Sequence, residues 1–91
     1  MKYSVIFLPE ADEDVKRIKK SGNKALLKKL NTLLEEISEH PTFGTGKPEQ
    51  LKHYEIPTWS RRISGEHRLV YRIQDDVITV LILSAYGHYN K

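Results

Sequence analysis

The stretch Trp59–Tyr71, which reads WSRRISGEHRLVY, predicts the centre of the fold. Two runs of strand-forming residues flank Ser64-Gly65-Glu66, and a three-residue loop with glycine near the left-handed region suits a β-hairpin. The predicted partners across this hairpin are Ile63 with His67, Arg62 with Arg68, Arg61 with Leu69, and Trp59 with Tyr71. We therefore expect antiparallel strands over residues 59–63 and 67–73.

Alternation along these two strands separates apolar from basic side chains, because successive residues of a strand point to opposite faces. One predicted face carries Trp59, Ile63, Leu69, Tyr71 and Ile73, and the other carries Ser60, Arg62, Arg68 and Arg72. A two-residue loop would instead mix aromatic side chains and arginines on both faces. The three-residue loop is therefore the better interpretation.

The opposition of Arg62 and Arg68 is unfavourable, since like charges directly across a strand pair cost a few tenths to about 1 kcal/mol. An anion bound between the two guanidinium groups would remove this repulsion. A phosphate matches the hydrogen-bonding geometry of arginine and is the obvious candidate. A solvated charged face without a ligand is the other interpretation, and the pattern alone leaves both open.

Toward the N-terminus, the pattern predicts a strand followed by two helices. Residues Lys2–Leu8 are rich in strand formers, and Pro9 suits the first position of a helix. The first helix ends at Ser21-Gly22-Asn23, and the second covers Lys24–Glu39. Its apolar stripe consists of Leu26, Leu30, Leu33 and Ile37, widened by Leu27 and Leu34. Together the two segments predict a helical hairpin with one apolar side.

Toward the C-terminus, Val77–Tyr86 follows a predicted two-residue turn at Asp75-Asp76 and is apolar on both faces, as a central strand should be. Glu49–Tyr54 is a further candidate strand. The expected fold is α+β: an N-terminal strand, a helical hairpin, and then a three- or four-stranded antiparallel sheet in a second layer. Residues 1–91 are expected to form a single domain.

Composition excludes several kinds of chemistry. The 91 residues include no cysteine, which removes disulfides, zinc–thiolate sites and thiol nucleophiles. No set of histidines and carboxylates has metal-ligand spacing, so we expect neither a metal nor a cofactor. There is no long apolar run and no signal-peptide pattern, which predicts a cytoplasmic protein without membrane contact. The net charge of +3 weakly favours a polyanionic partner.

Three sequence blocks and the terminal residues carry a family resemblance. The blocks are Gly46–His53 (GKPEQLKH), Trp59–Ile63 (WSRRI) and Glu66–Tyr71 (EHRLVY), and the last is Gly87-His88-Tyr89. This arrangement resembles the Txe/YoeB group of the RelE/ParE toxin superfamily. The resemblance implies a RelE-like fold and a bacterial type II toxin that binds the ribosome and cleaves mRNA. It also implies neutralisation by a cognate antitoxin, and homodimers are common in the group.

The same resemblance assigns roles to individual residues. The catalytic positions fall on Glu49, Arg68 and His88, and the substrate-binding positions fall on Lys52, Arg62, Glu66 and Tyr89. Such a set suits RNA cleavage, because RNA supplies its own nucleophile in the 2′-hydroxyl group. The enzyme then needs a base, a cation beside the phosphate and an acid, which the glutamate, arginine and histidine provide.

The position of His88 depends on the geometry of the last strand. Strict alternation after a two-residue Asp75-Asp76 turn puts His88 on the apolar face, so a bulge at Gly87 or a different turn is needed to bring it to Arg68. Two other functions stay open at this stage. One is a ParE-like toxin that inhibits DNA gyrase without cutting nucleic acid, and the other is an inactive nucleic-acid-binding domain.

Overall fold

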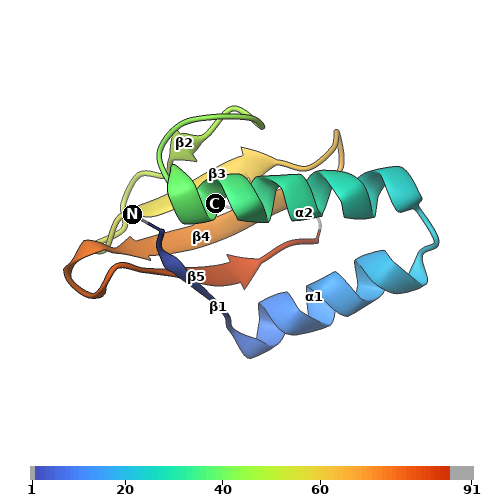
Figure 1. The fold of residues 1–91 in the computed structure, drawn as a ribbon, viewed down its shortest axis with the longest axis horizontal. Helices are drawn as coiled ribbons and strands as arrows, with labels where there is room; N and C mark the ends of the chain where they lie inside the picture. Colours follow the sequence, from blue (N-terminus) through green and yellow to red (C-terminus); the bar gives the residue numbers. More distant parts are fainter. Residues whose placement is uncertain (1, 87–91) are drawn as a thin grey trace.

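The computed structural model describes residues 2–86, in which a strand and two helices precede four further strands (Figure 1). The elements are β1 (Ser4–Phe7), α1 (Pro9–Lys20), α2 (Lys24–Glu39), β2 (Glu49–Gln50), β3 (Thr58–Arg62), β4 (Arg68–Gln74) and β5 (Thr79–Ser84). A short 3-10 helix, η1 (Asp75–Val77), joins the last two strands. The expected α+β architecture is confirmed. Neither α-helix of residues 2–86 is long and apolar enough to cross a membrane.

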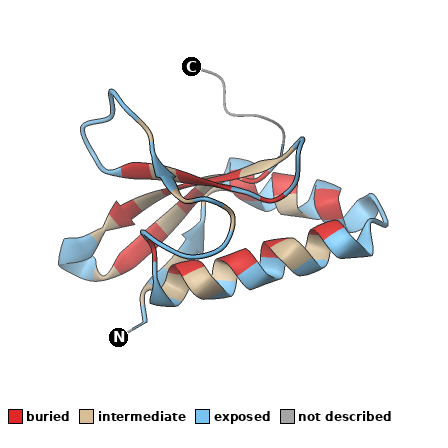
Figure 2. Cartoon of the chain, turned by 90° about the horizontal axis from the view of Figure 1, so that it is seen from above, coloured by how far each residue is buried: buried red, intermediate tan, exposed pale blue. Residues whose placement is uncertain are grey.

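The two helices begin and end where the sequence predicts. Pro9 occupies the start of α1, and the side chain of Asn23 caps α2 by accepting a hydrogen bond from the backbone N–H of Leu26 at 3.0 Å. The buried side of α2 consists of Leu26, Leu30, Leu33 and Ile37. Burying each such side chain contributes about 1.5–3 kcal/mol, so this stripe fixes the helix on the sheet. Figure 2 shows buried residues along the strands and along one side of each helix.

The sheet has five strands in the order β1-β5-β4-β3-β2, and it is mixed. The four strands β2 to β5 are antiparallel, as expected, whereas β1 lies parallel to β5 with Ser4 opposite Thr79. This edge pairing was not predicted. Parallel strands need a long crossover connection, which here includes both helices and three strands. Local sequence patterns therefore do not predict which strand pairs with β1.

The predicted register of the β3–β4 hairpin is confirmed. Trp59 lies opposite Tyr71, Arg61 opposite Leu69, and Arg62 opposite Arg68. The helices cover the face that carries Leu69 and Tyr71, both fully buried. We call the opposite face, which carries Ser60, Arg62, Arg68, Val70 and Arg72, the open face.

The bounds of β2 and of β5, which covers Thr79–Ser84 rather than Val77–Tyr86, differ most from the prediction. The expected strand over Glu49–Tyr54 is reduced to Glu49–Gln50, because the backbone turns away after Leu51 and His53 adopts a left-handed φ of 69°. The expected two-residue turn at Asp75-Asp76 is wrong. Residues 75–78 form the connection, in which Ile78 takes a left-handed φ of 48°, and β5 therefore starts at Thr79.

A β-bulge interrupts the alternation of β5. Tyr71 pairs with Ile82 but Val70 pairs with Ser84, which leaves Leu83 as an additional residue. The bulge therefore lies four residues before Gly87, the position at which one was expected. It turns Ser84 toward the open face, a reversal of the kind that the placement of His88 requires. Residues Gly87–Lys91, including His88 and Tyr89, lie outside the described part of the chain.

Candidate functional site

Glu49 shares the open face with the arginines of β3 and β4. Glu49 pairs directly with Ser60, and directly paired residues of an antiparallel ladder have their side chains on the same face. Arg62 lies two residues beyond Ser60 on β3, and Arg68 lies opposite Arg62 on β4. A carboxylate and two guanidinium groups from three adjacent strands are thus on one surface. The backbones of β2 and β4 are roughly 10 Å apart, since each strand spacing is about 4.8 Å.

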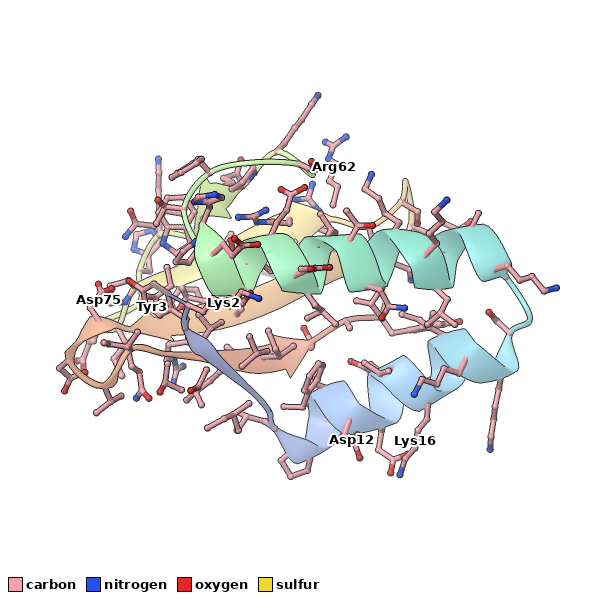
Figure 3. All side chains as sticks on the ribbon, viewed as in Figure 1. Lys2, Tyr3, Asp12, Lys16, Arg62 and Asp75 are labelled. Carbon is pink, nitrogen blue, oxygen red and sulfur yellow. The ribbon has the colours of Figure 1, made fainter. Side chains whose placement is uncertain are left out.

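The arginines of the open face have no acidic partner among residues 2–86. The ion pairs of this part of the chain join Lys16 to Asp12 and Glu13, and Arg61 to Glu36. Arg62 is exposed, and Figure 3 shows its side chain reaching beyond the ribbon on the β2 side of the sheet. Arg68 is half-buried. The site therefore carries uncompensated positive charge, which favours an anionic ligand.

Two buried polar atoms on this face also lack partners. The hydroxyl oxygen of Ser60, a fully buried residue, and Nε of Arg72 form no hydrogen bond with residues 2–86. Nearly all buried polar atoms in folded proteins are hydrogen-bonded, and an exception calls for an explanation such as a bound water, an ion or a catalytic role. Ser60 lies opposite Val70, between Glu49 on β2 and the two arginines of β4. The unpartnered atoms thus fall within the same surface as the charged groups.

The remaining predicted site residues are placed less closely together. Lys52 is exposed in the segment that follows β2. The preceding residue, Leu51, donates its backbone N–H to the carbonyl oxygen of Thr58 at 2.8 Å. Glu66 is exposed in the β3–β4 turn, where its backbone N–H donates to the hydroxyl group of Ser64 at 3.2 Å. Both flank the open face rather than lie in its centre. His88 and Tyr89 fall among the residues that are not described.

Arg61 has a structural role that the sequence patterns above do not predict. Its side chain is fully buried on the face that the helices cover. Nε donates to the hydroxyl group of Tyr71 at 3.0 Å, and Nη1 donates to Glu36 at 3.2 Å. The two Nη atoms also bind three carbonyl oxygens of the loop before β2, namely those of His40, Phe43 (2.8 Å) and Thr45 (3.3 Å). Arg61 therefore fastens this loop to the sheet.

The sequence did hold a signal for this role. The predicted register puts Arg61 opposite Leu69, on the same face as Trp59 and Ile63, and a charged residue on an apolar face needs buried partners. Those partners are carbonyl oxygens of a loop about 20 residues earlier in the chain. No local pattern predicts that the loop folds back over β3.

Glu36 holds the same loop from α2. Its carboxylate accepts hydrogen bonds from the backbone N–H and the hydroxyl group of Thr45, both at 2.7 Å. These bonds, followed by the charge of Arg61, hold the pKa of Glu36 below its ordinary value. Thr45 lies four residues before Glu49, so the Glu36–Arg61 pair sets the path of the chain into the open face.

The lowered pKa predicts how stability depends on pH. The ionised carboxylate of Glu36 stabilises the fold above its ordinary pKa of 4.5, and this contribution is lost as the pH falls through the lowered folded-state value. Glu36→Gln is therefore expected to lower the melting temperature at neutral pH and to flatten its decline between about pH 5 and pH 3. Thermal unfolding across this range measures the effect. Glu35→Gln, an exposed neighbour on α2, is the control and should keep the wild-type profile.

Asp14 of α1 holds the backbone at the end of β5. It lies on the buried side of α1, where it is 6% exposed, and its Oδ2 accepts the backbone N–H of Ala85 at 3.0 Å. Ala85 directly follows β5 and precedes His88 by three residues. Among residues 2–86 there is no group of three or more histidine, aspartate or glutamate side chains that could hold a metal ion.

Comparison with known proteins identifies the class to which this fold and surface belong. The fold matches that of the YoeB dimer from Staphylococcus aureus, with a TM-score of 0.82 and 39% identity over 98% of this chain and 100% of that one. It also matches the YoeB–YefM complex from the same organism, with a TM-score of 0.78, 40% identity, and coverage of 98% and 100%. The class is thus that of small bacterial toxins.

The sequence comparisons narrow this class to a family. The family described as "YoeB-like toxin of bacterial type II toxin-antitoxin system" matches residues 7–89. Toxin YoeB of Escherichia coli (strain K12) is 46% identical over 67 residues, which cover 74% of this chain and 77% of that protein. The chain therefore belongs to the YoeB-like toxin family.

Proposed function

We propose that this protein is a ribosome-dependent endoribonuclease that cleaves mRNA with its own side chains. The observation that carries the proposal is the common face of Glu49, Arg62 and Arg68, with no acidic partner for either arginine among residues 2–86. Family membership supports it, because the toxins of this family belong to type II toxin–antitoxin systems. The net charge of +3 suits an RNA partner.

The proposed reaction uses the nucleophile that RNA already contains. Glu49 accepts the proton of the 2′-hydroxyl group, and the 2′-oxygen attacks the adjacent phosphorus. Arg68 stabilises the charge that develops on the phosphate oxygens. The bond from phosphorus to the 5′-oxygen breaks, and His88 donates a proton to that leaving oxygen. The products are a 2′,3′-cyclic phosphate and a 5′-hydroxyl end, and no metal or cofactor takes part.

The supporting residues would hold the RNA on either side of the scissile bond. Arg62 lies directly across from Arg68, and a phosphate between the two guanidinium groups would relieve the repulsion between them. Lys52 and Glu66 flank the open face at the end of β2 and in the β3–β4 turn. Tyr89 stacks on a base or hydrogen-bonds to the phosphate.

We further propose two protein partners. One is a cognate antitoxin, since the Staphylococcus aureus YoeB forms a complex with YefM. The other is a second copy of the chain, since the same relative forms a dimer. An antitoxin that covers the open face would block the reaction by occupying the surface on which Glu49 and Arg68 meet the RNA.

Mapping of transcript ends tests the proposed function. Purified protein is incubated with ribosomes and end-labelled mRNA, and fragments are located by primer extension. We expect cleavage only with ribosomes present, with a 2′,3′-cyclic phosphate on the upstream fragment. Intact mRNA together with inhibited DNA supercoiling would overturn the proposal in favour of a gyrase inhibitor. If the protein binds RNA but leaves the mRNA intact, the proposal would be overturned in favour of an inactive nucleic-acid-binding domain.

A further inference from the structure

A pocket of about 330 Å³ lies beside the open face, at the edge of the sheet. It is formed between the middle of α2, the loop that enters β2 and the β3–β4 turn. Its lining residues are Lys29, Gly46, Lys47, Arg62, Ile63, Ser64 and Gly65. Of the predicted site residues it contains Arg62 but neither Glu49 nor Arg68, so it is distinct from the proposed catalytic centre.

Every charged group in this pocket is a cation. Lys29, Lys47 and Arg62 come from three separate segments of the chain, and no acidic side chain lines the pocket. None of the three forms an ion pair within residues 2–86. Three like charges around one cavity repel each other, and an anion bound in the cavity would offset this repulsion by its attraction to all three.

The backbone that presents Lys47 is tightly constrained. Gly46 has a φ of 87°, and its carbonyl oxygen accepts the N–H of Arg62 at 2.7 Å. A Cβ atom at residue 46 would lie 2.9 Å from the carbonyl oxygen of Arg62 and 3.1 Å from a methyl carbon of Leu33. Lys47 itself takes a left-handed φ of 51°, a conformation that is strained for lysine and is typical of functional sites.

The composition of the pocket indicates what part of a nucleic acid it binds. No aromatic side chain lines it, so it offers no aromatic ring on which a base could stack. The ammonium groups of two lysines and a guanidinium group are instead suited to phosphate oxygens. Arg62 joins the pocket to the open face, because it lies directly opposite Arg68.

We propose that this pocket binds a backbone phosphate of RNA other than the scissile one. The inference rests on the proposed function, since it takes RNA as the partner. The phosphate belongs either to the strand that is cut or to the RNA of the ribosome. Both sources offer the same chemistry, and the two arms of the experiment distinguish them.

The experiment measures binding rather than cleavage. Lys29→Gln, Lys47→Gln and the double variant are titrated, over a series of salt concentrations, with a 2′-O-methyl RNA oligonucleotide that cannot be cut. A second titration uses purified ribosomes. We expect each substitution to weaken binding several-fold in at least one arm, and to reduce the slope of log affinity against log salt by about 0.7 for each phosphate that is no longer neutralised. Weaker binding of the oligonucleotide assigns the phosphate to the cut strand, and weaker binding of ribosomes alone assigns it to ribosomal RNA.

Two further variants separate the pocket from general charge effects. Lys28→Gln removes an exposed lysine that neighbours Lys29 on α2 and does not line the pocket, and it should leave the salt slope unchanged. Lys29→Arg keeps the positive charge and should restore binding. Wild-type affinity and slope for the double variant in both arms, or an equal loss in Lys28→Gln, would overturn the inference. A protein that binds RNA through the pocket but does not cut it would overturn the proposed function alone.

Discussion

Replacement of Arg68 by alanine is expected to slow ribosome-dependent mRNA cleavage about 10²–10³-fold, a loss of roughly 3–4 kcal/mol of transition-state stabilisation. In the proposed reaction, charge accumulates on the phosphate oxygens during 2′-hydroxyl attack, and the guanidinium group of Arg68 would meet that charge without reorganisation. Arg68 has no acidic partner among residues 2–86, so its full charge is available to the substrate. Single-turnover cleavage of labelled mRNA on purified ribosomes measures the rate.

Stability distinguishes this loss from damage to the fold. Arg68 lies opposite Arg62, so its removal relieves a repulsion of a few tenths to about 1 kcal/mol, and Arg68→Ala should unfold no more easily than the wild type. Glu49→Ala and His88→Ala should each lower the rate at least about tenfold, since a general base or acid typically contributes 10²–10⁴-fold. Lys20→Ala, an exposed cation at the end of α1, is the control. Full activity of a folded Arg68→Ala protein would remove the arginine from the mechanism.

Arg61→Leu is expected to destabilise the protein by about 3–5 kcal/mol, because the substitution removes the partner of several buried or partly buried acceptors at once. The carbonyl oxygens of His40, Phe43 and Thr45 would lose their donors, and Glu36 would lose its cation. For a domain of this size the melting temperature should fall by at least about 12 °C. Urea and thermal unfolding at neutral pH measure the change.

The neighbouring arginine provides a matched control. Arg62→Leu removes the same side chain one position along β3, but from the exposed face, and should lower stability by no more than about 0.5 kcal/mol, since it also relieves the repulsion with Arg68. Arg61→Lys keeps the charge but offers a single donor group, so it should fall between the wild type and Arg61→Leu. If Arg61→Leu does not fold, Arg61→Lys still tests the role by its melting temperature. Equal stability of Arg61→Leu and Arg62→Leu would contradict the proposed role of Arg61 in holding the loop before β2.

The candidate site was partly predictable because it lies on a hairpin. In the β3–β4 hairpin, turn length and two-residue alternation together place Arg62 opposite Arg68 and put both on the face away from Leu69. Glu49 was assigned by resemblance, and its pairing with Ser60 then puts it on the same face. The charge pattern of this face was thus predictable from the sequence, whereas the pocket beside Lys29 was not. That pocket depends on how α2 packs against the sheet.

Local patterns in the sequence were enough to predict the bounds of α1 and α2, the β3–β4 pairing, and the separation of apolar from basic faces. These features follow from periodicity, caps and turn length, which act over a few residues. No local pattern predicts the parallel pairing of β1 with β5, the bulge at Leu83 or the burial of Arg61, which arise when the chain folds as a whole. Each of these depends on partners that are distant along the chain and become neighbours only when the apolar faces pack together.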